Sequence, residues 1–225
     1  MSAPRPYVLL SAAVSIDGYL DDTTPARLLL SSPEDFAEVD EVRAGVDAIL
    51  VGAGTVRADN PRLLVRSPVH RRRRIERGLP ENPVKVALSG GGQLDPAAAF
   101  FTAGDTERLV YVPGAALPAA TARLGAVATV VGAGDPLDPA ALLADLAGRG
   151  VARLLVEGGG TVHTLFLTAG LVDELRLAMA PIFVGDPAAP RLVGPGEFPW
   201  QGERRLRLAG VRALGDTAVL RYLAT

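Results

Sequence analysis

The chain has 225 residues, of which 48% are hydrophobic, and a formal net charge of −2. This composition is typical of an ordinary globular protein, so a disordered chain is excluded and a nucleic acid is not an expected partner. With no cysteine and two histidines, disulfides and thiolate chemistry are excluded, and we expect no metal site. No stretch approaches the roughly 20 apolar residues of a membrane span, and residues 1–6 lack the apolar core of a signal peptide, so we predict a cytoplasmic protein.

The first third of the chain alternates apolar strands with helical segments. Residues 7–16 predict a strand buried on both faces, which ends in the turn Ser15–Gly18. Ser32 is the predicted N-cap of a helix that begins at Pro33. The predicted inner face of this helix packs on the sheet and consists of Phe36, Val39 and Val42. Residues 47–51 predict a second buried strand, followed by Gly52-Ala53-Gly54-Thr55-Val56.

Two polar segments follow this second strand. Residues 57–66 are predicted to be irregular, because Pro61 forbids a regular helix through their middle. Residues 67–83 contain four consecutive arginines, Arg71 to Arg74, between prolines. In a slightly acidic protein we interpret this run as a solvated, mobile surface loop in preference to an anion-binding patch.

The remaining chain predicts further strands and helices. Asp138-Pro139 begins a predicted helix with a buried stripe at Leu142, Leu143 and Leu146. Strands are expected at 84–88, 109–112, 127–131, 154–157 and 174–180, and a terminal hairpin at 204–213 and 217–223. The pattern predicts an α/β fold with a mixed, mostly parallel sheet, helices on both faces and a C-terminal antiparallel hairpin. We see no domain boundary, so residues 1–225 are expected to form a single domain.

The stretch from Leu154 to Thr161 is the most informative. An apolar strand ends at Glu157, three glycines and a threonine, and a helix of about eight residues follows before Gly170. Glycines allow the backbone to approach a phosphate, and the helix N-terminus favours an anion. A tight turn without a ligand explains the same sequence equally well. His163, on this helix, is expected to be a packed residue.

Several predicted strands end in glycine together with a hydroxyl or a carboxylate. The polar residues at these ends are Thr55, Ser89, Glu157 and Thr161. In open α/β sheets ligands bind beyond the carboxyl ends of the strands, so this concentration favours a phosphate-bearing cofactor. Neither glycine cluster is a Walker loop or a Rossmann fingerprint.

The order of these motifs resembles the reductase domain of bacterial riboflavin biosynthesis. The resemblance rests on Arg5-Pro6-Tyr7-Val8, Ser15–Gly18, Leu50–Val56 with Ala58–Leu63, Leu155–Thr161, Gly170–Glu174 and Ala180-Pro181. It covers nearly the whole chain. It implies a three-layer dihydrofolate-reductase-like fold, a homodimer, and NADPH-dependent reduction of the ribosyl group of 5-amino-6-(5-phosphoribosylamino)uracil to ribityl. Relatives are often fused to a zinc deaminase, for which this chain has no room, so we expect a stand-alone reductase.

The resemblance also implies site residues. Glu157 would lie near the reacting centre, and a carboxylate, Asp59 or Glu157, could polarise the ring-opened imine. The substrate phosphate and pyrimidine would be held by Arg43, Asp59, Arg62 and Arg66. The implied cofactor-binding residues are Ala13, Asp17, Gly18, Gly52, Gly54, Thr55, Val56, Ser89, Gly158, Gly159, Gly160 and Thr161. Without the resemblance, each arginine could simply be solvated and Asp59-Asn60-Pro61 could be only a turn.

Three departures from the family pattern lie on the expected substrate side. They are Ser11 in place of a lysine, Tyr19 in place of a basic residue, and Arg27 in an altered segment before the capped helix. The alternative is therefore a related NADPH-dependent reductase of another pyrimidine, pteridine or dihydrofolate-like substrate. A non-catalytic nucleotide-binding module is a further hypothesis, which the presence of the glycines, Thr55 and Asp59 disfavours.

Overall fold

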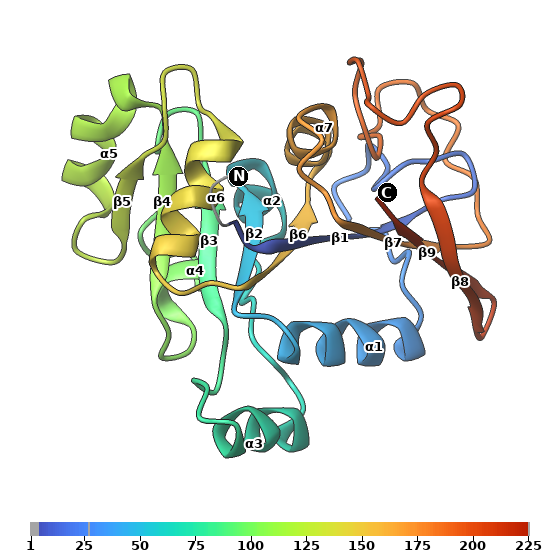
Figure 1. Cartoon of the computed structure of the whole chain (residues 1–225), viewed down its shortest axis with the longest axis horizontal. Coiled ribbons are helices and arrows are strands. Elements are labelled where there is room, and N and C mark those ends of the chain that lie inside the picture. The colour runs from blue at the N-terminus through green and yellow to red at the C-terminus, as the bar shows by residue number, and fades with distance from the viewer. Residues whose placement is uncertain (1–4, 27, 225) are drawn as a thin grey trace. The chain divides into compact units, whose positions relative to one another are not determined.

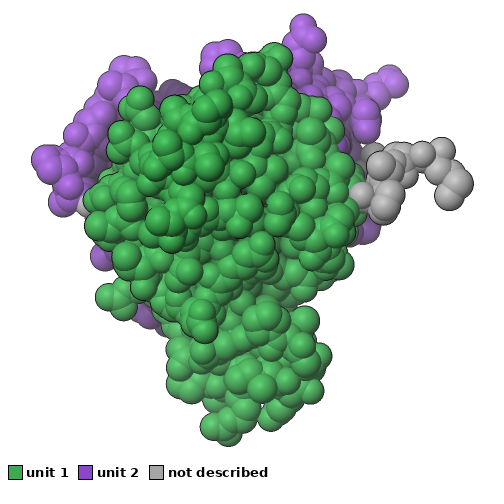
Figure 2. Space-filling model, turned by 90° about the vertical axis from the view of Figure 1, so that its left-hand side faces the viewer, with its two compact units in different colours: residues 1–7, 40–155 green, residues 8–39, 156–225 purple. Residues whose placement is uncertain are grey.

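The computed structural model describes residues 5–26 and 28–224, so Arg27 lies outside the described residues. The chain forms two compact units, one comprising residues 1–7 and 40–155 and the other residues 8–39 and 156–225 (Figure 2). Three elements pass from one unit to the other along the chain. They are β1 (Tyr7–Val14), α1 (Pro33–Ala44) and β6 (Arg153–Gly158) (Figure 1). A single domain over residues 1–225 stays a prediction.

Unit 1 is built on parallel strands in the order β5-β4-β3-β2. Its strands are β2 (Ala48–Gly52), β3 (Val84–Leu88), β4 (Arg108–Val112) and β5 (Thr129–Gly132). Its helices are α2 (Ala53–Asp59), α3 (Pro68–Glu76), α4 (Ala99–Thr102), α5 (Leu117–Leu124) and α6 (Pro139–Gly148), with a 3-10 turn, η1 (Gly114–Ala116). Every residue of β2 is buried, as expected of a strand covered on both faces. The predicted cap at Asp138 and the buried stripe of α6 are confirmed.

Unit 2 combines parallel and antiparallel pairing. Strand β1 pairs in parallel with β7 (Glu174–Met179), which pairs antiparallel with β9 (Thr217–Leu223). The last pair is the predicted hairpin of β8 (Arg207–Leu214) and β9, whose turn contains Gly215 at φ +57°. Helix α7 (Gly160–Thr168) follows β6. The sheet pairings therefore confirm the mixed, mostly parallel α/β architecture with an antiparallel C-terminal end.

The expectation of a mobile loop at residues 67–83 is wrong. Helix α3 begins after Ser67, whose hydroxyl accepts from the His70 N–H, and Pro68 occupies its first turn. Arg74 is only 2% exposed, and its guanidinium donates to the carbonyls of Pro80, Ala44 and Val46 at 2.7–3.0 Å. The helix forms the labelled lower part of unit 1 in Figure 1 and the lower lobe of the green unit in Figure 2.

Two further expectations need correction. Residues 57–59 are not irregular but form the last turn of α2, which ends just before Pro61. Helix α1 begins at Pro33 with Ser32 as its cap, as predicted. Its apolar positions Phe36, Val39 and Val42 are only half-buried, however.

The two buried residues of α1, Asp35 and Asp40, are both acids. In unit 2, Asp35 is 0% exposed and its carboxylate pairs with the guanidinium of Arg176 on β7, which also donates to Glu38. Arg212 of β8 donates to the same Glu38 carboxylate at 2.7 Å. On this side of the unit 2 strands, salt bridges are therefore formed in addition to the half-buried apolar side chains. A buried charge is tolerated there because each acid has a hydrogen-bonded cation.

Among the described residues, no helix combines the length and the apolar character needed to cross a membrane.

Candidate functional site

In unit 1, strand β2 leads directly into α2 through Gly52, which is the N-cap of the helix. Gly54 is exposed, and a Cβ atom added there would meet nothing within 4 Å. Thr55 is half-buried, whereas Val56 is buried and anchors the helix. The first turn therefore leaves free space beside its backbone, as close approach by a ligand requires.

The N-termini of α2 and α7 differ from that of α1. Helix α1 has the Ser32 cap and two acids, Glu34 and Asp35, in its first turn. Neither α2 nor α7 has a side-chain cap or an acidic residue in its first turn. No capping or first-turn side chain of these two helices therefore opposes the partial positive charge of the helix end, which suits a bound anion.

Ser89 follows strand β3 in unit 1 and is 4% exposed. Its hydroxyl oxygen accepts a hydrogen bond of 2.9 Å from the backbone N–H of Gly92. The side chain therefore shapes the glycine turn at 89–92, and its hydroxyl hydrogen is left to donate. The role of Ser89 in cofactor binding stays a prediction.

In unit 1, Arg43 reaches the backbone of the segment that contains Arg62 and Arg66. The Arg43 guanidinium donates to the carbonyl of Leu64 at 3.3 Å, two residues before Arg66. Arg62 and Arg66 are exposed, and Asp59 is half-buried at the end of α2. This segment also contains two non-glycine residues with a left-handed backbone conformation, Asn60 at φ +43° and Leu63 at φ +47°.

Asp40 was not predicted from the sequence, although it organises this part of unit 1. It is 6% exposed, and its carboxylate accepts from the backbone N–H groups of Arg66 and Ser67 and contacts Nδ1 of His70 at 3.2 Å. Burial opposes the ionised form, but these hydrogen bonds outweigh it and lower the pKa of Asp40. Asp40 thereby fixes the backbone of the predicted substrate residue Arg66. Its partners lie 26 to 30 residues away in the chain, so no local pattern indicated them.

In unit 2, the turn after β1 is held by Asp17. Its carboxylate accepts from the Ser15 hydroxyl at 2.6 Å and from the backbone N–H groups of Val184 and Gly185. The Ser15 hydrogen bond is the largest cause that lowers the pKa of Asp17. The carboxylate fastens the segment after β7, and Gly18 closes the turn at φ +85°. Ala13, another of the predicted cofactor-binding residues, lies on β1 and is half-buried.

The glycines after β6 serve the packing of unit 2. A Cβ atom at Gly160 would lie 2.4 Å from the carbonyl oxygen of Arg191, and one at Gly158 would lie 3.2 Å from Nε2 of His163. Gly158 also has φ +122°, which disfavours any other residue. Gly159 is the N-cap of α7, Thr161 is exposed and Glu157 is half-buried. The hypothesis of a tight turn without a ligand therefore explains Gly158 and Gly160. The uncapped N-terminus of α7 is also compatible with a bound anion.

His163 is fully buried, as predicted for a packed residue. Its Nδ1 lies 3.1 Å from the carbonyl oxygen of Leu192, so this nitrogen is the donor and Nε2 is unprotonated. Burial lowers the pKa of His163 to about 4, because the charged ring would be desolvated. The imidazole is therefore neutral at physiological pH.

Two of the three departures noted in the sequence are buried in unit 2. Ser11 is 6% exposed and stands in register with Arg176 of β7. Tyr19 is 3% exposed, and the Arg191 guanidinium lies 4.3 Å from its ring centroid and donates to its hydroxyl at 2.6 Å. Both residues are part of the internal packing of the unit.

Comparison with solved structures identifies the class of fold. The RibD protein of Acinetobacter baumannii aligns with all of this chain and 59% of its own chain, with a TM-score of 0.79 and 26% sequence identity. The predicted dihydrofolate-reductase-like fold is thereby confirmed. The molecule is an α/β oxidoreductase of this class.

A family model described as the RibD C-terminal domain matches residues 6–220, so the chain belongs to this family. A 2,5-diamino-6-ribosylamino-4(3H)-pyrimidinone 5′-phosphate reductase from Archaeoglobus fulgidus is 35% identical, over 94% of this chain and 95% of the relative. The protein of the same name from Methanothermobacter thermautotrophicus is 36% identical, over 97% of this chain and 98% of the relative. The expectation of a riboflavin-biosynthesis reductase is confirmed.

Proposed function

We propose that the protein reduces the ribosyl group of a ribosylaminopyrimidine 5′-phosphate to ribityl, with NADPH as the hydride donor. The observation that carries the cofactor assignment is the first turn of α2 in unit 1, which follows β2 and Gly52, has neither a side-chain cap nor an acidic residue, and leaves open space at Gly54. Backbone N–H groups at such helix ends bind phosphates. When bound, NADPH would supply the hydride. The open space beside Gly54 would allow the cofactor to approach the protein backbone closely.

The chain's own residues would bind and orient the substrate. Arg43, Arg62 and Arg66 carry guanidinium groups that match the geometry of a phosphate. Opening of the sugar ring moves a proton from the exocyclic nitrogen to the ring oxygen and leaves a C1′–N imine. Hydride addition at C1′ then requires one proton at the nitrogen, and a carboxyl group, Asp59 or Glu157, would supply it. The products are the ribitylamine and the oxidised cofactor.

Two pyrimidines are candidates for the substrate, and they carry the same ribosyl group. The relatives that match over nearly their full length favour 2,5-diamino-6-ribosylamino-4(3H)-pyrimidinone 5′-phosphate. The sequence motifs resemble those of enzymes that act on 5-amino-6-(5-phosphoribosylamino)uracil. The two compounds differ at C2, where the first has an amino group and the second a carbonyl. We propose the diaminopyrimidinone as the preferred substrate and the uracil as the second candidate.

The test is the loss of NADPH absorbance with each pyrimidine, and in parallel with dihydrofolate. We expect turnover on a pyrimidine and a fall of at least about 100-fold in Asp59→Ala, because a positioned proton donor contributes roughly this much. Arg72→Ala, at an exposed position on α3, is the matched control and should keep full activity. Activity on dihydrofolate alone would contradict the substrate class. Tight NADPH binding with no oxidation by any compound would contradict the enzyme assignment.

We also propose a cytoplasmic homodimer. Strand β8, which pairs with β9, exposes Leu208 to 51% and Val211 to 59%, and exposed apolar side chains on a strand favour association. Light scattering of the purified protein should give about twice the mass of the chain. A monomer at micromolar concentration would refute the dimer.

A further inference from the structure

Asn60, the C-cap residue that follows helix α2, has the left-handed conformation, with φ 43° and ψ 53°. The backbone N–H of Asn60 donates to the carbonyl of Val56 at 3.1 Å, which closes the last turn. Asparagine and glycine adopt this conformation far more readily than other residues. The turn therefore directs the chain sharply between Asp59 on the helix and Arg62 beyond it.

The side chain of Asn60 makes a second connection. Its amide oxygen accepts a hydrogen bond of 2.7 Å from the backbone N–H of Ala99, the first residue of α4. The bond joins residues 39 positions apart in the chain. Asn60 therefore sets the conformation of its own backbone and also ties it to another element of unit 1.

Helix α4 is a rigid attachment point. Phe100 and Phe101 are 0% and 3% exposed, and their rings pack edge to face with centroids 4.8 Å apart. The fully buried Lys85 of β3 donates to the carbonyls of Phe100 and Ala103 at 3.1 and 2.5 Å. A tie to α4 is thus a tie to the core of unit 1.

Two neighbouring observations support a fixed arrangement of this segment. The Arg57 guanidinium, on α2, donates to the carbonyl of Gln93 at 3.3 Å, so α2 is joined to residues 93–99 at two points. Leu63 has φ +47° although it is a branched residue, and it is 2% exposed. Residues other than glycine keep a left-handed backbone conformation only where the surrounding structure fixes it. Such residues are concentrated at functional sites.

We propose that Asn60 is a positioning residue for the reductase reaction. It acts through Asp59, which precedes it, and Arg62, two residues after it, and it has no contact of its own with the substrate. The left-handed turn aims the two side chains, and the Ala99 hydrogen bond holds the turn against α4. This inference rests on the proposed function of Asp59 and Arg62.

Three substitutions separate the two contributions of Asn60. Asn60→Asp keeps the acceptor and tolerates the backbone conformation, so kcat should stay within about threefold of the wild type. Asn60→Gly keeps the backbone conformation without the hydrogen bond, and Asn60→Ala loses both. We expect kcat to fall by about tenfold or more in Asn60→Ala and by less in Asn60→Gly, because small displacements of catalytic groups are costly. The assay temperature must lie well below the melting temperature of each variant.

A second measurement does not depend on activity. Amide hydrogen exchange in the unliganded protein should quicken in residues 53–66 and 93–103 of Asn60→Ala and should remain as in the wild type in Asn60→Asp. Wild-type kcat in Asn60→Ala with only a lowered melting temperature would mean a purely structural role and would overturn the proposal. So would equal losses of kcat in Asn60→Asp and Asn60→Ala. If the wild type itself neither turns over nor binds NADPH, the proposed function fails, and unchanged exchange in Asn60→Ala would then separately refute the tie to α4.

Discussion

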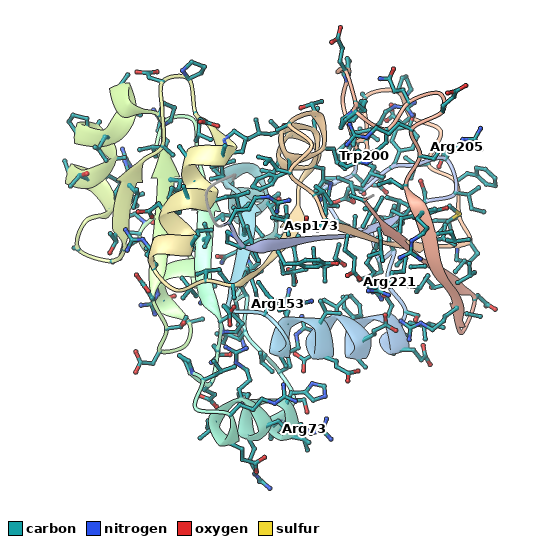
Figure 3. The ribbon with its side chains drawn as sticks, in the orientation of Figure 1. Arg73, Arg153, Asp173, Trp200, Arg205 and Arg221 are labelled. Atoms are coloured by element: carbon teal, nitrogen blue, oxygen red, sulfur yellow. The ribbon has the colours of Figure 1, made fainter. Side chains whose placement is uncertain are left out.

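Removal of the Arg74 side chain should destabilise the protein far more than removal of its neighbour Arg73. Both belong to the run of four arginines in α3, and Figure 3 labels Arg73 on this helix. Arg73 is exposed, whereas Arg74 is buried and donates to three carbonyl groups. Ala44 is the last residue of α1, so Arg74 satisfies a carbonyl that has no partner within the helix.

The structure gives the magnitude of this effect. Hydrogen bonds that involve a charged group contribute about 1.5–3 kcal/mol each, and acceptors left buried without a partner cost a similar amount. Burial of the guanidinium opposes this gain, since burial lowers the pKa of Arg74. We therefore expect Arg74→Ala to lower the free energy of unfolding by about 2–4 kcal/mol, within the range for a broken buried network. Arg73→Ala should change it by less than about 0.5 kcal/mol.

The two variants are compared by thermal and urea unfolding under the same conditions. For a domain of this size each 1 kcal/mol shifts Tm by about 2–4 °C, so Arg74→Ala should melt about 4–16 °C below the wild type. Arg74→Lys should fall between the two, because an ammonium keeps the charge but cannot reach three carbonyls in a planar array. Equal melting temperatures for Arg74→Ala and Arg73→Ala would refute the anchoring role and restore the interpretation of residues 67–83 as a solvated loop.

Two further predictions concern pH. Burial, with a smaller contribution from Arg108, lowers the pKa of Lys85 to about 8 from 10.5. Between these pH values the unfolded chain binds more protons than the folded protein, so the free energy of unfolding should rise with pH by about 1–3 kcal/mol relative to Lys85→Met. Parallel curves of unfolding free energy against pH for wild type and Lys85→Met would contradict this prediction. For His163, with a pKa of about 4 against 6.5 in the unfolded chain, the stability contribution is complete above about 6.5 and is lost as pH falls toward 4. Urea titrations of wild type and His163→Gln over this interval should diverge by up to about 3 kcal/mol, and a constant difference would show that folding leaves the pKa of His163 unchanged.

The strands and capped helices were predictable because their signals are local. The buried runs of β2 and β3 and the Ser32-Pro33 start of α1 were found within one or two residues. The same Ser-Pro signal precedes α3 at Ser67-Pro68, but the run of four arginines led to the prediction of a solvated loop. Burial of Arg74 depends on carbonyls 28 and 30 residues away, which no local pattern reveals.

The candidate site was predictable in kind but not in its supporting contacts. The glycine turn at 158–160 was recognised, yet the sequence could not show that Gly160 accommodates the Arg191 carbonyl. Acids in the middle of a helix suggest exposure, so Asp40 gave no sign that it fixes the backbone of Arg66. The roles of Asp59 and Glu157 depend on the ligand, and they remain predictions for mutagenesis.

The pairing of β1 with β7 has a consequence for synthesis of the chain. The N–H of Val8 donates to the carboxylate of Asp173, labelled in Figure 3, across 165 residues. The apolar β1 strand is therefore synthesised long before its partner β7. The other edge of β7 stays unpaired until β9 has been synthesised. Unpaired strand edges promote aggregation, so a nascent chain that stalls before residue 217 would present one. A chain truncated before residue 217 would therefore expose the β7 edge, even though every candidate site residue had already been translated.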